Sequence, residues 1–198
     1  MSVSSIAVFD TLTRDEIVVA SNAGGRSTYQ NAGRTRRSGI EASLDYRFAK
    51  AWRAQLAYTY IEAIYVDRYA TCAATPCKVP NMLIASGNRL PGVPHHDAYA
   101  RIGWGRPLGW RAALTGQYIS AIAVNDANTQ YAAAYPVFDA SGGYAREFGS
   151  TRVSLFLRLN NLLDRHYVGS VIVDDGNGRY FEPAPGFNVL AGLTAAFR

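Results

Sequence analysis

The stretch YRFAKAWRAQLAYTYI, residues 46–61, carries the clearest indication of the fold class. Its two halves alternate apolar and polar side chains, and a three-residue break at residues 49–51 separates them. A period of two is typical of a β-strand with one apolar face, and so short a break predicts a tight turn between antiparallel strands. Phe48 and Trp52 flank the turn. The stretch therefore predicts a β-hairpin with large aromatic side chains beside its turn.

The same alternation recurs along the whole chain and predicts an all-β protein. In each segment one parity is apolar and the other is polar or small, as in Ile40, Leu44 and Phe48 against Glu41 and Asp45. The predicted strands are residues 4–20, 27–48, 51–66, 94–106, 109–122, 135–148, 151–170 and 187–198. A helix remains the alternative for LFLRLNNLLDRHY, residues 155–167.

Connection lengths distinguish two classes of β protein in which apolar and polar residues alternate along the strands. Short joints at residues 49–51, 105–109 and 149–150 alternate with long ones at residues 67–93, 123–134 and 171–186. A soluble sandwich turns its apolar faces into a core, whereas an outer-membrane barrel turns one apolar face to lipid and has short turns at one end and long loops at the other. The alternation favours an antiparallel transmembrane β-barrel segment.

Aromatic residues cluster beside the short joints, and all of them fall on the apolar parity of their strands. A ring of aromatics at each membrane boundary is typical of such barrels. The predicted girdle consists of Phe48, Trp52, Trp104, Trp110 and Phe148. A second ring near the long loops would consist of Tyr58, Tyr60, Tyr118 and Tyr167. The alternative is that these aromatics close the ends of a soluble core.

The opposite parity carries charge, which would be costly in lipid. This predicted inner set contains Glu41, Asp45, Arg47, Arg53, Arg101, Arg111, Arg152 and Arg158 among small residues. Eight strands can close into a small barrel, but its interior is only just filled by side chains. The charged set fits better on the wall of a wider barrel, where water or a plug contacts it.

Composition excludes several other classes. Of 198 residues, 48% are hydrophobic and 18% charged, and no apolar run approaches the ~18 residues of a transmembrane helix. The formal charge of +5 is dispersed, so nucleic acid is not an expected partner. Residues 1–16 lack the pattern of a secretory signal, which leaves a cytosolic protein or a missing true start as expectations.

Few residues have a pattern typical of a chemical site. Cys72 and Cys77, in ATCAATPC of the longest loop, do not have zinc-site spacing, so we expect a disulfide, with two free thiols as the alternative. His95 and His96 are adjacent, which is poor geometry for a shared metal, and one must point outward.

Asp174 and Asp175 in VDDGNGRY lack the further carboxylates of a calcium loop and indicate a turn. No nucleophile, base and orienting group occur together, so we expect no enzyme, no catalytic residue, no cofactor and no metal.

Five segments together resemble the C-terminal part of a TonB-dependent outer-membrane receptor. The segments are RSGIEASLDYRF, WRAQLAYTYIEA, NRLPGVPHHDAYARIGW, LRLNNLLDRHYVGSV and GNGRYFEPAPGFNVLAGLTAAFR. The resemblance extends over nearly the whole chain. Its most specific residues are Asn160, Asn161, Leu162, Leu163, Asp164, Tyr167, Pro183, Ala184, Pro185, Gly186 and the terminal aromatic Phe197. Phe187, where the family often has Arg, and Arg198, which follows the terminal aromatic, depart from the pattern.

The resemblance implies a barrel of about 22 strands, closed by an N-terminal plug, in the Gram-negative outer membrane. It implies energised uptake of ferric siderophores or other scarce nutrients. Expected partners are outer-membrane lipid, the TonB-type inner-membrane energy complex acting through the plug, and the barrel-insertion machinery. Residues 1–198 would supply about eight strands and no plug, so we expect a truncated receptor, inactive alone. The alternative is a stand-alone eight-stranded barrel with a structural or adhesive role.

Overall fold

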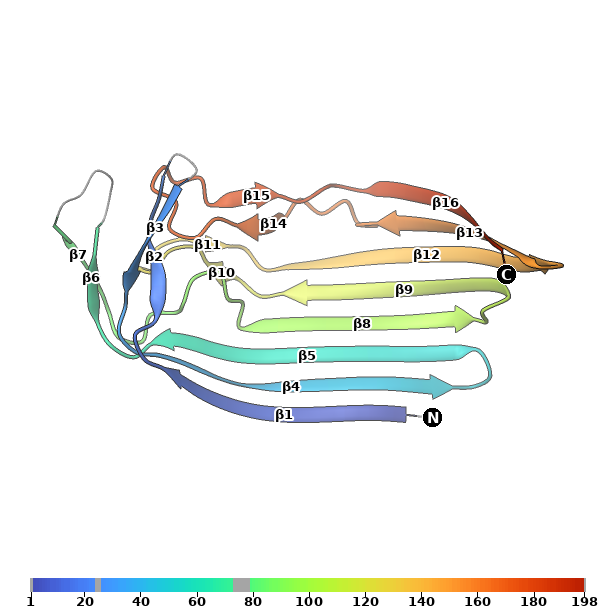
Figure 1. The fold of residues 1–198 in the computed structure, drawn as a ribbon, viewed down its shortest axis with the longest axis horizontal. Coiled ribbons are helices and arrows are strands. Elements are labelled where there is room, and N and C mark those ends of the chain that lie inside the picture. The colour runs from blue at the N-terminus through green and yellow to red at the C-terminus, as the bar shows by residue number, and fades with distance from the viewer. Residues whose placement is uncertain (1, 24–25, 73–78, 198) are drawn as a thin grey trace.

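A computed structural model describes residues 2–23, 26–72 and 79–197, and its main feature is one antiparallel sheet (Figure 1). Eight long strands follow one another across this sheet in chain order. They are β1 (Ser2–Thr13), β4 (Thr35–Phe48), β5 (Trp52–Tyr65), β8 (His96–Gly105), β9 (Gly109–Ile119), β12 (Tyr135–Phe148), β13 (Thr151–Asn160) and β16 (Asn188–Phe197). The all-β prediction is therefore confirmed. The described residues include no helix long and apolar enough to cross a bilayer.

Four short ribbons extend the connections at one end of the sheet (Figure 1). Each ribbon is an antiparallel strand pair inserted between two long strands. The ribbons are β2 (Ile17–Ala23) with β3 (Arg26–Asn31), β6 (Tyr69–Thr71) with β7 (Met82–Ile84), β10 (Ile122–Ala123) with β11 (Tyr131–Ala132), and β14 (Val168–Val171) with β15 (Phe181–Pro183). The three short turns lie at the other end, which confirms the predicted alternation of short and long connections.

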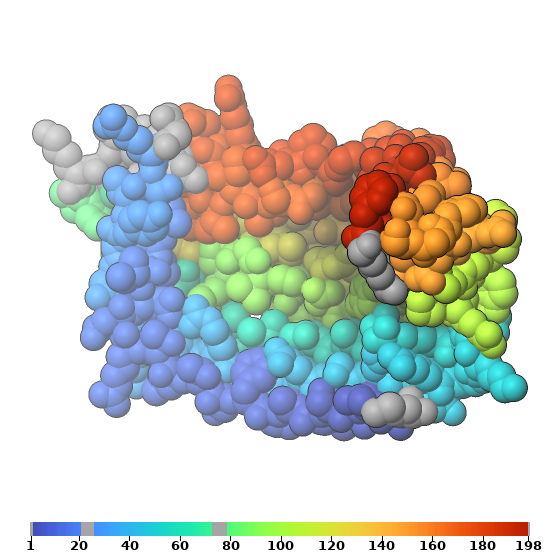
Figure 2. All heavy atoms as spheres, turned by 45° about the vertical axis from the view of Figure 1, so that its right-hand side comes forward, coloured from blue at the N-terminus to red at the C-terminus, as the bar shows by residue number. Residues whose placement is uncertain are grey.

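The sheet curves into a wall with a hollow side. Figure 2 shows this hollow between the N-terminal strands at the bottom and the C-terminal strands at the top. β1 and β16 are the first and last strands of the sheet order. Both chain ends lie at the end of the short turns (Figure 1).

Several predicted strand boundaries were wrong, and each for a local reason. The predicted strand 4–20 divides into β1 and β2 because Asp15 adopts a positive φ of 56°. The predicted strand 27–48 divides into β3 and β4 near Gly33, whose φ is 75°. Positive φ turns the chain out of the extended conformation.

The predicted strand 151–170 ends at Asn160, because Asn161 and Asp164 have φ values of 51° and 46°. β14 begins only at Val168, so residues 155–167 form a strand end and a turn, and the helical alternative is wrong. The remaining predicted strands agree with β5, β8, β9, β12 and β16 to within three residues at each end.

The buried hydrophobic cluster lies at the long-connection end of the wall, where β5 ends. Ala32, Ala63, Tyr65, Ile84 and Leu90 form a buried cluster there, and Tyr65 is only 1% exposed. Along the sheet itself, large apolar side chains on the convex face are exposed, as is Leu193 with 68%. The connections are thus packed against each other, while the wall offers both of its faces to surroundings outside the chain.

Candidate functional site

The strand register places the predicted apolar residues on one continuous face. Leu44 pairs with Leu56, Ile102 with Leu114, and Leu155 with Leu193, and the same parity extends from β1 to β16. Leu155 is 52% exposed and Leu193 is 68% exposed. An apolar surface this large is rare on a monomeric soluble protein and indicates contact with lipid or another apolar surface.

The five residues of the predicted girdle all lie on this apolar face, next to the short turns. Trp52 pairs with both Phe48 and Trp104 in the register, and its ring stacks on Phe48 at 6.1 Å. Trp110 contacts Tyr144 at 4.9 Å between centroids. Phe148, the last residue of β12, is 56% exposed. The structure brings the five to one end of one face, and their role as a membrane girdle stays a prediction.

The tyrosines expected in a second ring lie nearer the long connections. Tyr58 and Tyr60 lie on the apolar face, where the Tyr58 hydroxyl is 2.8 Å from Nδ1 of His96. Tyr118 is on the same face, opposite Pro136. Tyr167 lies after β13, and its ring contacts that of Tyr135 at 4.3 Å between centroids, with the two planes tilted by 33°. A second girdle therefore stays a prediction as well.

The rings of His95 and His96 both contact the ring of Tyr60, at 6.1 Å and 5.2 Å between centroids, so the prediction that one of them points outward stays a prediction. His96 pairs with Tyr60 on the apolar face, and its ring centroid lies 6.4 Å from that of His95. In the described part of the chain, no three His, Cys, Asp or Glu side chains come together as a metal site would need.

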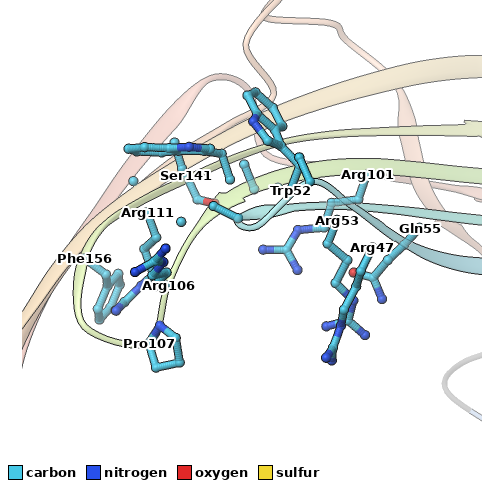
Figure 3. A pocket seen from close by; sticks show the side chains of 18 of the residues that line it. Arg47, Trp52, Arg53, Gln55, Arg101, Arg106, Pro107, Arg111, Ser141 and Phe156 are labelled. Carbon is cyan, nitrogen blue, oxygen red and sulfur yellow. The ribbon is translucent and has the colours of Figure 1, made fainter. Parts of the chain in front are cut away.

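The opposite face is polar and, near the short turns, basic. Figure 3 shows Arg47, Arg53 and Arg101 on one side of a hollow, and Arg106 and Arg111 on another. The hollow has a volume of about 630 Å³. It is also lined by Lys50, Arg158, Gln55, Pro107 and Phe156.

Few carboxylates compensate these cations. The guanidinium of Arg53 binds Asp45, with Nε 2.8 Å from Oδ1. Within the described residues, no ion pair to a carboxylate is found for Arg101, Arg111 or Arg158. A guanidinium group without a carboxylate partner must find other polar contacts, so this face needs water or an anionic partner against it. The two faces of the wall thus suit different surroundings.

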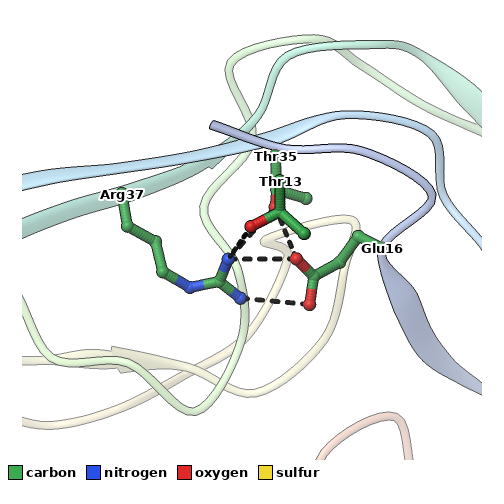
Figure 4. A network of polar contacts seen from close by, with 4 residues as sticks. All are labelled: Thr13, Glu16, Thr35 and Arg37. Atoms are coloured by element: carbon green, nitrogen blue, oxygen red, sulfur yellow. Dashed lines mark hydrogen bonds and ion pairs between the residues drawn. The ribbon is translucent and has the colours of Figure 1, made fainter. Parts of the chain in front are cut away.

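Ion pairs join the connections at the other end of the wall. Figure 4 shows Arg37 bound to Glu16, with Thr13 and Thr35 bound into the same network. The hydrogen bonds from Arg37 hold the pKa of Glu16 below its usual range. Arg34 binds Asp67 through two guanidinium nitrogens, at 2.9 and 2.7 Å, and lowers the pKa of Asp67 to about 2. Both carboxylates stay charged at neutral pH.

The motif around Asn161 fastens the turn after β13 to the start of β16. Asn161 is 2% exposed, and its side chain Nδ2 donates to the carbonyls of Arg165 (2.9 Å) and Pro185 (3.2 Å). Its Oδ1 accepts the backbone N–H of Arg165 at 2.9 Å. Its own backbone N–H donates to Asp139 at 2.8 Å. Asn is also among the residues that best tolerate positive φ. Asn161 therefore provides both the hydrogen bonds and the backbone conformation that this turn requires.

Other motif residues act at the same junction. Asp164 accepts the backbone N–H of Phe187 at 2.8 Å, and Nδ2 of Asn160 donates to Asn188 at 2.7 Å. A Cβ on Gly186 would lie 2.7 Å from the Asp164 carboxylate, so a larger residue there would collide with it. By contrast, Leu163, Pro183 and Phe197 are exposed. Their roles stay predictions.

One cluster of polar residues has no signal in the sequence, and only its Tyr65 and Asp126 are fully buried. Tyr65, Tyr69, Asp126 and Asp174 meet beneath the connections, although 109 residues separate the first from the last. The spacing of Asp174 and Asp175 predicted only a turn, and Asp175 does accept the backbone N–H of Arg179 at 2.6 Å. Distance along the chain concealed the contact between Asp126 and Asp174.

The predicted disulfide involves Cys77, which lies outside the described residues, so it stays a prediction. Protein from an oxidising compartment is expected to be lighter than its reduced form by the mass of two hydrogens, because Cys72 and Cys77 are linked. The closed loop is short, so reduction should lower the free energy of unfolding by about 2 kcal/mol. Intact-mass spectrometry and urea titration measure both. Free thiols on both cysteines in folded, surface-exposed protein would contradict the disulfide.

Comparison with known proteins agrees with this geometry. The family model described as "TonB dependent receptor-like, beta-barrel" matches residues 2–162. Among solved structures, the siderophore receptor PiuA from Acinetobacter baumannii is similar, with a TM-score of 0.76 and 24% identity over 98% of this chain and 26% of that one.

Two further structures share the fold. The ferric-catecholate import receptor Fiu from E. coli K12, in its closed form, has a TM-score of 0.63 and 22% identity over 98% of this chain and 25% of that one. The copper transporter OprC has a TM-score of 0.66 and 17% identity over 99% of this chain and 28% of that one.

This chain thus spans about a quarter of the length of the structures that it matches. The two-faced wall of antiparallel strands and the family match over residues 2–162 lead to one conclusion. The chain belongs to the family of TonB-dependent receptor-like β-barrels, which are outer-membrane receptors and transporters rather than enzymes.

Proposed function

We propose that residues 1–198 form the C-terminal part of the wall of an outer-membrane receptor that imports ferric siderophores or similar scarce nutrients. The observation that carries the proposal is the division of the wall into an apolar face and a basic, polar face. In this arrangement the apolar face contacts outer-membrane lipid, and the basic face lines the lumen through which cargo passes.

The unpaired arginines support a wide, filled lumen. Arg101, Arg111 and Arg158 come from three different strands, and the hollow beside them has a volume of about 630 Å³. In a small closed barrel, these guanidinium groups would be forced together in a narrow interior. A plug or water in a wider lumen can instead bind each of them.

The remaining parts of the receptor are proposed from the share of the matched structures that this chain covers. About three quarters of each matched chain lies beyond the region of similarity, enough for the other strands of the wall and a plug. The plug would contact the TonB-type inner-membrane complex, which supplies energy. The barrel-insertion machinery would assemble the wall, and the long connections would gather cargo at the outer surface.

An uptake experiment tests this function. The complete receptor, with plug and earlier strands in frame, is expressed in a strain that lacks its own siderophore receptors. Uptake of radioactive iron is measured for a panel of ferric siderophores, and uptake of copper is measured in a parallel experiment. We expect uptake of at least one cargo, and its loss when the TonB gene is deleted. The matched control is the 198-residue chain with a working signal peptide, which should give no uptake.

Two outcomes would overturn the proposal. Absence of uptake of every cargo by a complete receptor that is folded in the outer membrane would contradict a transport role. Energised uptake by the 198-residue chain alone would show that these strands form a complete transporter. Outer-membrane insertion of that chain without any uptake, together with binding to cells or surfaces, would instead favour a stand-alone barrel with an adhesive role.

A further inference from the structure

Asp126 occupies a central place among the long connections. It lies between β10 and β11, is 2% exposed, and accepts hydrogen bonds on both carboxylate oxygens. The Tyr65 hydroxyl, at the end of β5, donates to Oδ1 at 2.5 Å, and the Tyr69 hydroxyl, in β6, donates to Oδ2. A buried carboxylate is thus held by two neutral donors.

Three connections meet at this residue. The backbone N–H of Asp126 donates to Oδ1 of Asp174, in the β14–β15 ribbon, at 3.0 Å. The backbone N–H of Asp174 donates in return to the carbonyl of Val124 at 3.0 Å. Asn88, in the β5–β8 connection, donates to the Asp126 carbonyl at 2.9 Å. Separating Asp126 from Asp174 would therefore release one connection from the other two.

We propose that Asp126 and Asp174 form a proton-operated clamp, in which one proton held by the pair keeps the β9–β12 and β13–β16 connections together and its loss lets them separate. The clamp is a property of the loop end alone, and it does not depend on which cargo the receptor carries.

Among the described residues around the pair, no positive charge compensates the two carboxyl groups. Of the titratable groups facing it from β5 and β6, Tyr65 and Tyr69 are neutral donors. Asp175, on the same ribbon as Asp174, binds the backbone of Arg179. Arg89, from the β5–β8 connection, extends over the ring of Tyr131 at 6.0 Å. In the part of the chain that the structure describes, two carboxyl groups thus share a buried site without an ion-pair partner.

Geometry assigns the proton to Asp174. Burial raises the pKa of Asp126 as well, but both of its oxygens accept hydroxyl hydrogen bonds, which counteract burial by favouring the charged form. Oδ2 of Asp174 is buried and, among the described residues, has no hydrogen-bond partner. A charged oxygen there would be unsolvated, whereas a protonated one is neutral. Burial, followed by the charge of Asp126, raises the pKa of Asp174 to about 7.

The sign of the pH effect follows from this raised pKa. With the connections closed, Asp174 holds its proton up to about pH 7, whereas an exposed Asp releases it near pH 3.8. Between these values the closed state binds more protons than the open state, so raising the pH favours opening. For one proton, the ratio of closed to open states falls by up to about tenfold per pH unit in this window. Below pH ~4 no further change is expected from this pair.

Hydrogen–deuterium exchange of the natural full-length protein in detergent tests the clamp. Exchange of peptides from residues 120–134 and 161–187 is measured from pH 5 to pH 8 and corrected for the intrinsic pH dependence of exchange. We expect protection of both segments in the wild type to fall as the pH rises. In Asp174→Asn, which keeps the Oδ1 acceptor but cannot ionise, protection should be independent of pH.

Asp175→Asn is the matched control, because it changes the neighbouring carboxyl that does not contact Asp126; it should keep the wild-type pH dependence. A wild type without pH dependence, or an Asp174→Asn variant that retains it, would overturn the clamp. Infrared titration of the wild type tests the clamp without any variant, so the test remains possible if a variant fails to fold. A buried carboxyl that loses its proton near pH 7 supports the proposal, and the absence of any such carboxyl refutes it.

Discussion

Leu155→Arg is expected to lower the free energy of unfolding by about 2 to 4 kcal/mol, because it would place a guanidinium in the middle of the proposed lipid-facing surface. Leu155 lies midway along β13 and pairs with Leu193 and Tyr144 on the apolar face. No water is available at that depth to solvate the charge. Urea titration of the complete protein refolded into lipid vesicles measures the change.

Two control substitutions test whether face and depth cause this effect. Thr194→Arg lies at the same level on β16 but on the polar face, so it should change stability by less than about 1 kcal/mol. Trp52→Arg is on the apolar face but beside a short turn, where about 0 to 1 kcal/mol is expected for an interfacial arginine, apart from the loss of ring packing. Equal costs at the three positions would contradict the assignment of the lipid face.

Asn161→Ala should have a comparable effect at the opposite end of the wall. It removes three hydrogen bonds made by a buried side chain, each worth about 1 kcal/mol, so a loss of about 3 kcal/mol is expected. It also places alanine at a φ of 51°, which alanine adopts less readily than asparagine. The same urea titration applies, and exchange should increase in residues 183–188.

Asn160→Ala is the matched control for this variant. Asn160 is the adjacent residue of the same type, but its side chain donates an exposed hydrogen bond to Asn188 and does not hold the turn together. A cost of about 0.5 to 1 kcal/mol is expected. If both variants lost the same stability, the motif would act through local turn propensity and not through the bonds of Asn161.

The wall could be predicted from the sequence because parity in a strand is local. Once Leu44, Leu56 and Leu155 were placed on the apolar parity, each short turn fixed the register of the next strand. The aromatic residues beside the turns followed from the same rule. Their placement needed no knowledge of contacts between distant residues.

The ribbons could not be predicted in the same way, because alternation continues through their boundaries. Val18 and Val19 continue the pattern of β1, so the break at Asp15 was visible only in the backbone angle. At Gly33 the signal was present, since Gly often marks a turn, but the flanking alternation outweighed it. Asn161 and Asp164 gave a similar signal, because both residue types favour turns.

The cluster of Tyr65, Tyr69, Asp126 and Asp174 could not be predicted from the sequence for a different reason. Asp126 sits in a stretch of turn-forming residues, and Tyr65 and Asp174 contact it from 61 residues before and 48 residues after. Such contacts depend on how three connections pack over one another. One sequence by itself contains no local signal for that packing.

The ribbons also make the wall suitable as a display scaffold. Each ribbon pairs its own two strands, and β2 with β3 and β14 with β15 hold the chain in register before it returns to the sheet. A foreign peptide grafted near Gly178, in the exposed segment between β14 and β15, would begin and end at neighbouring points of that ribbon. The lengthened loop would cost little closure entropy. The eight long strands would keep their pairing, so a vaccine epitope or a binding peptide could be presented there without redesigning the part that faces lipid.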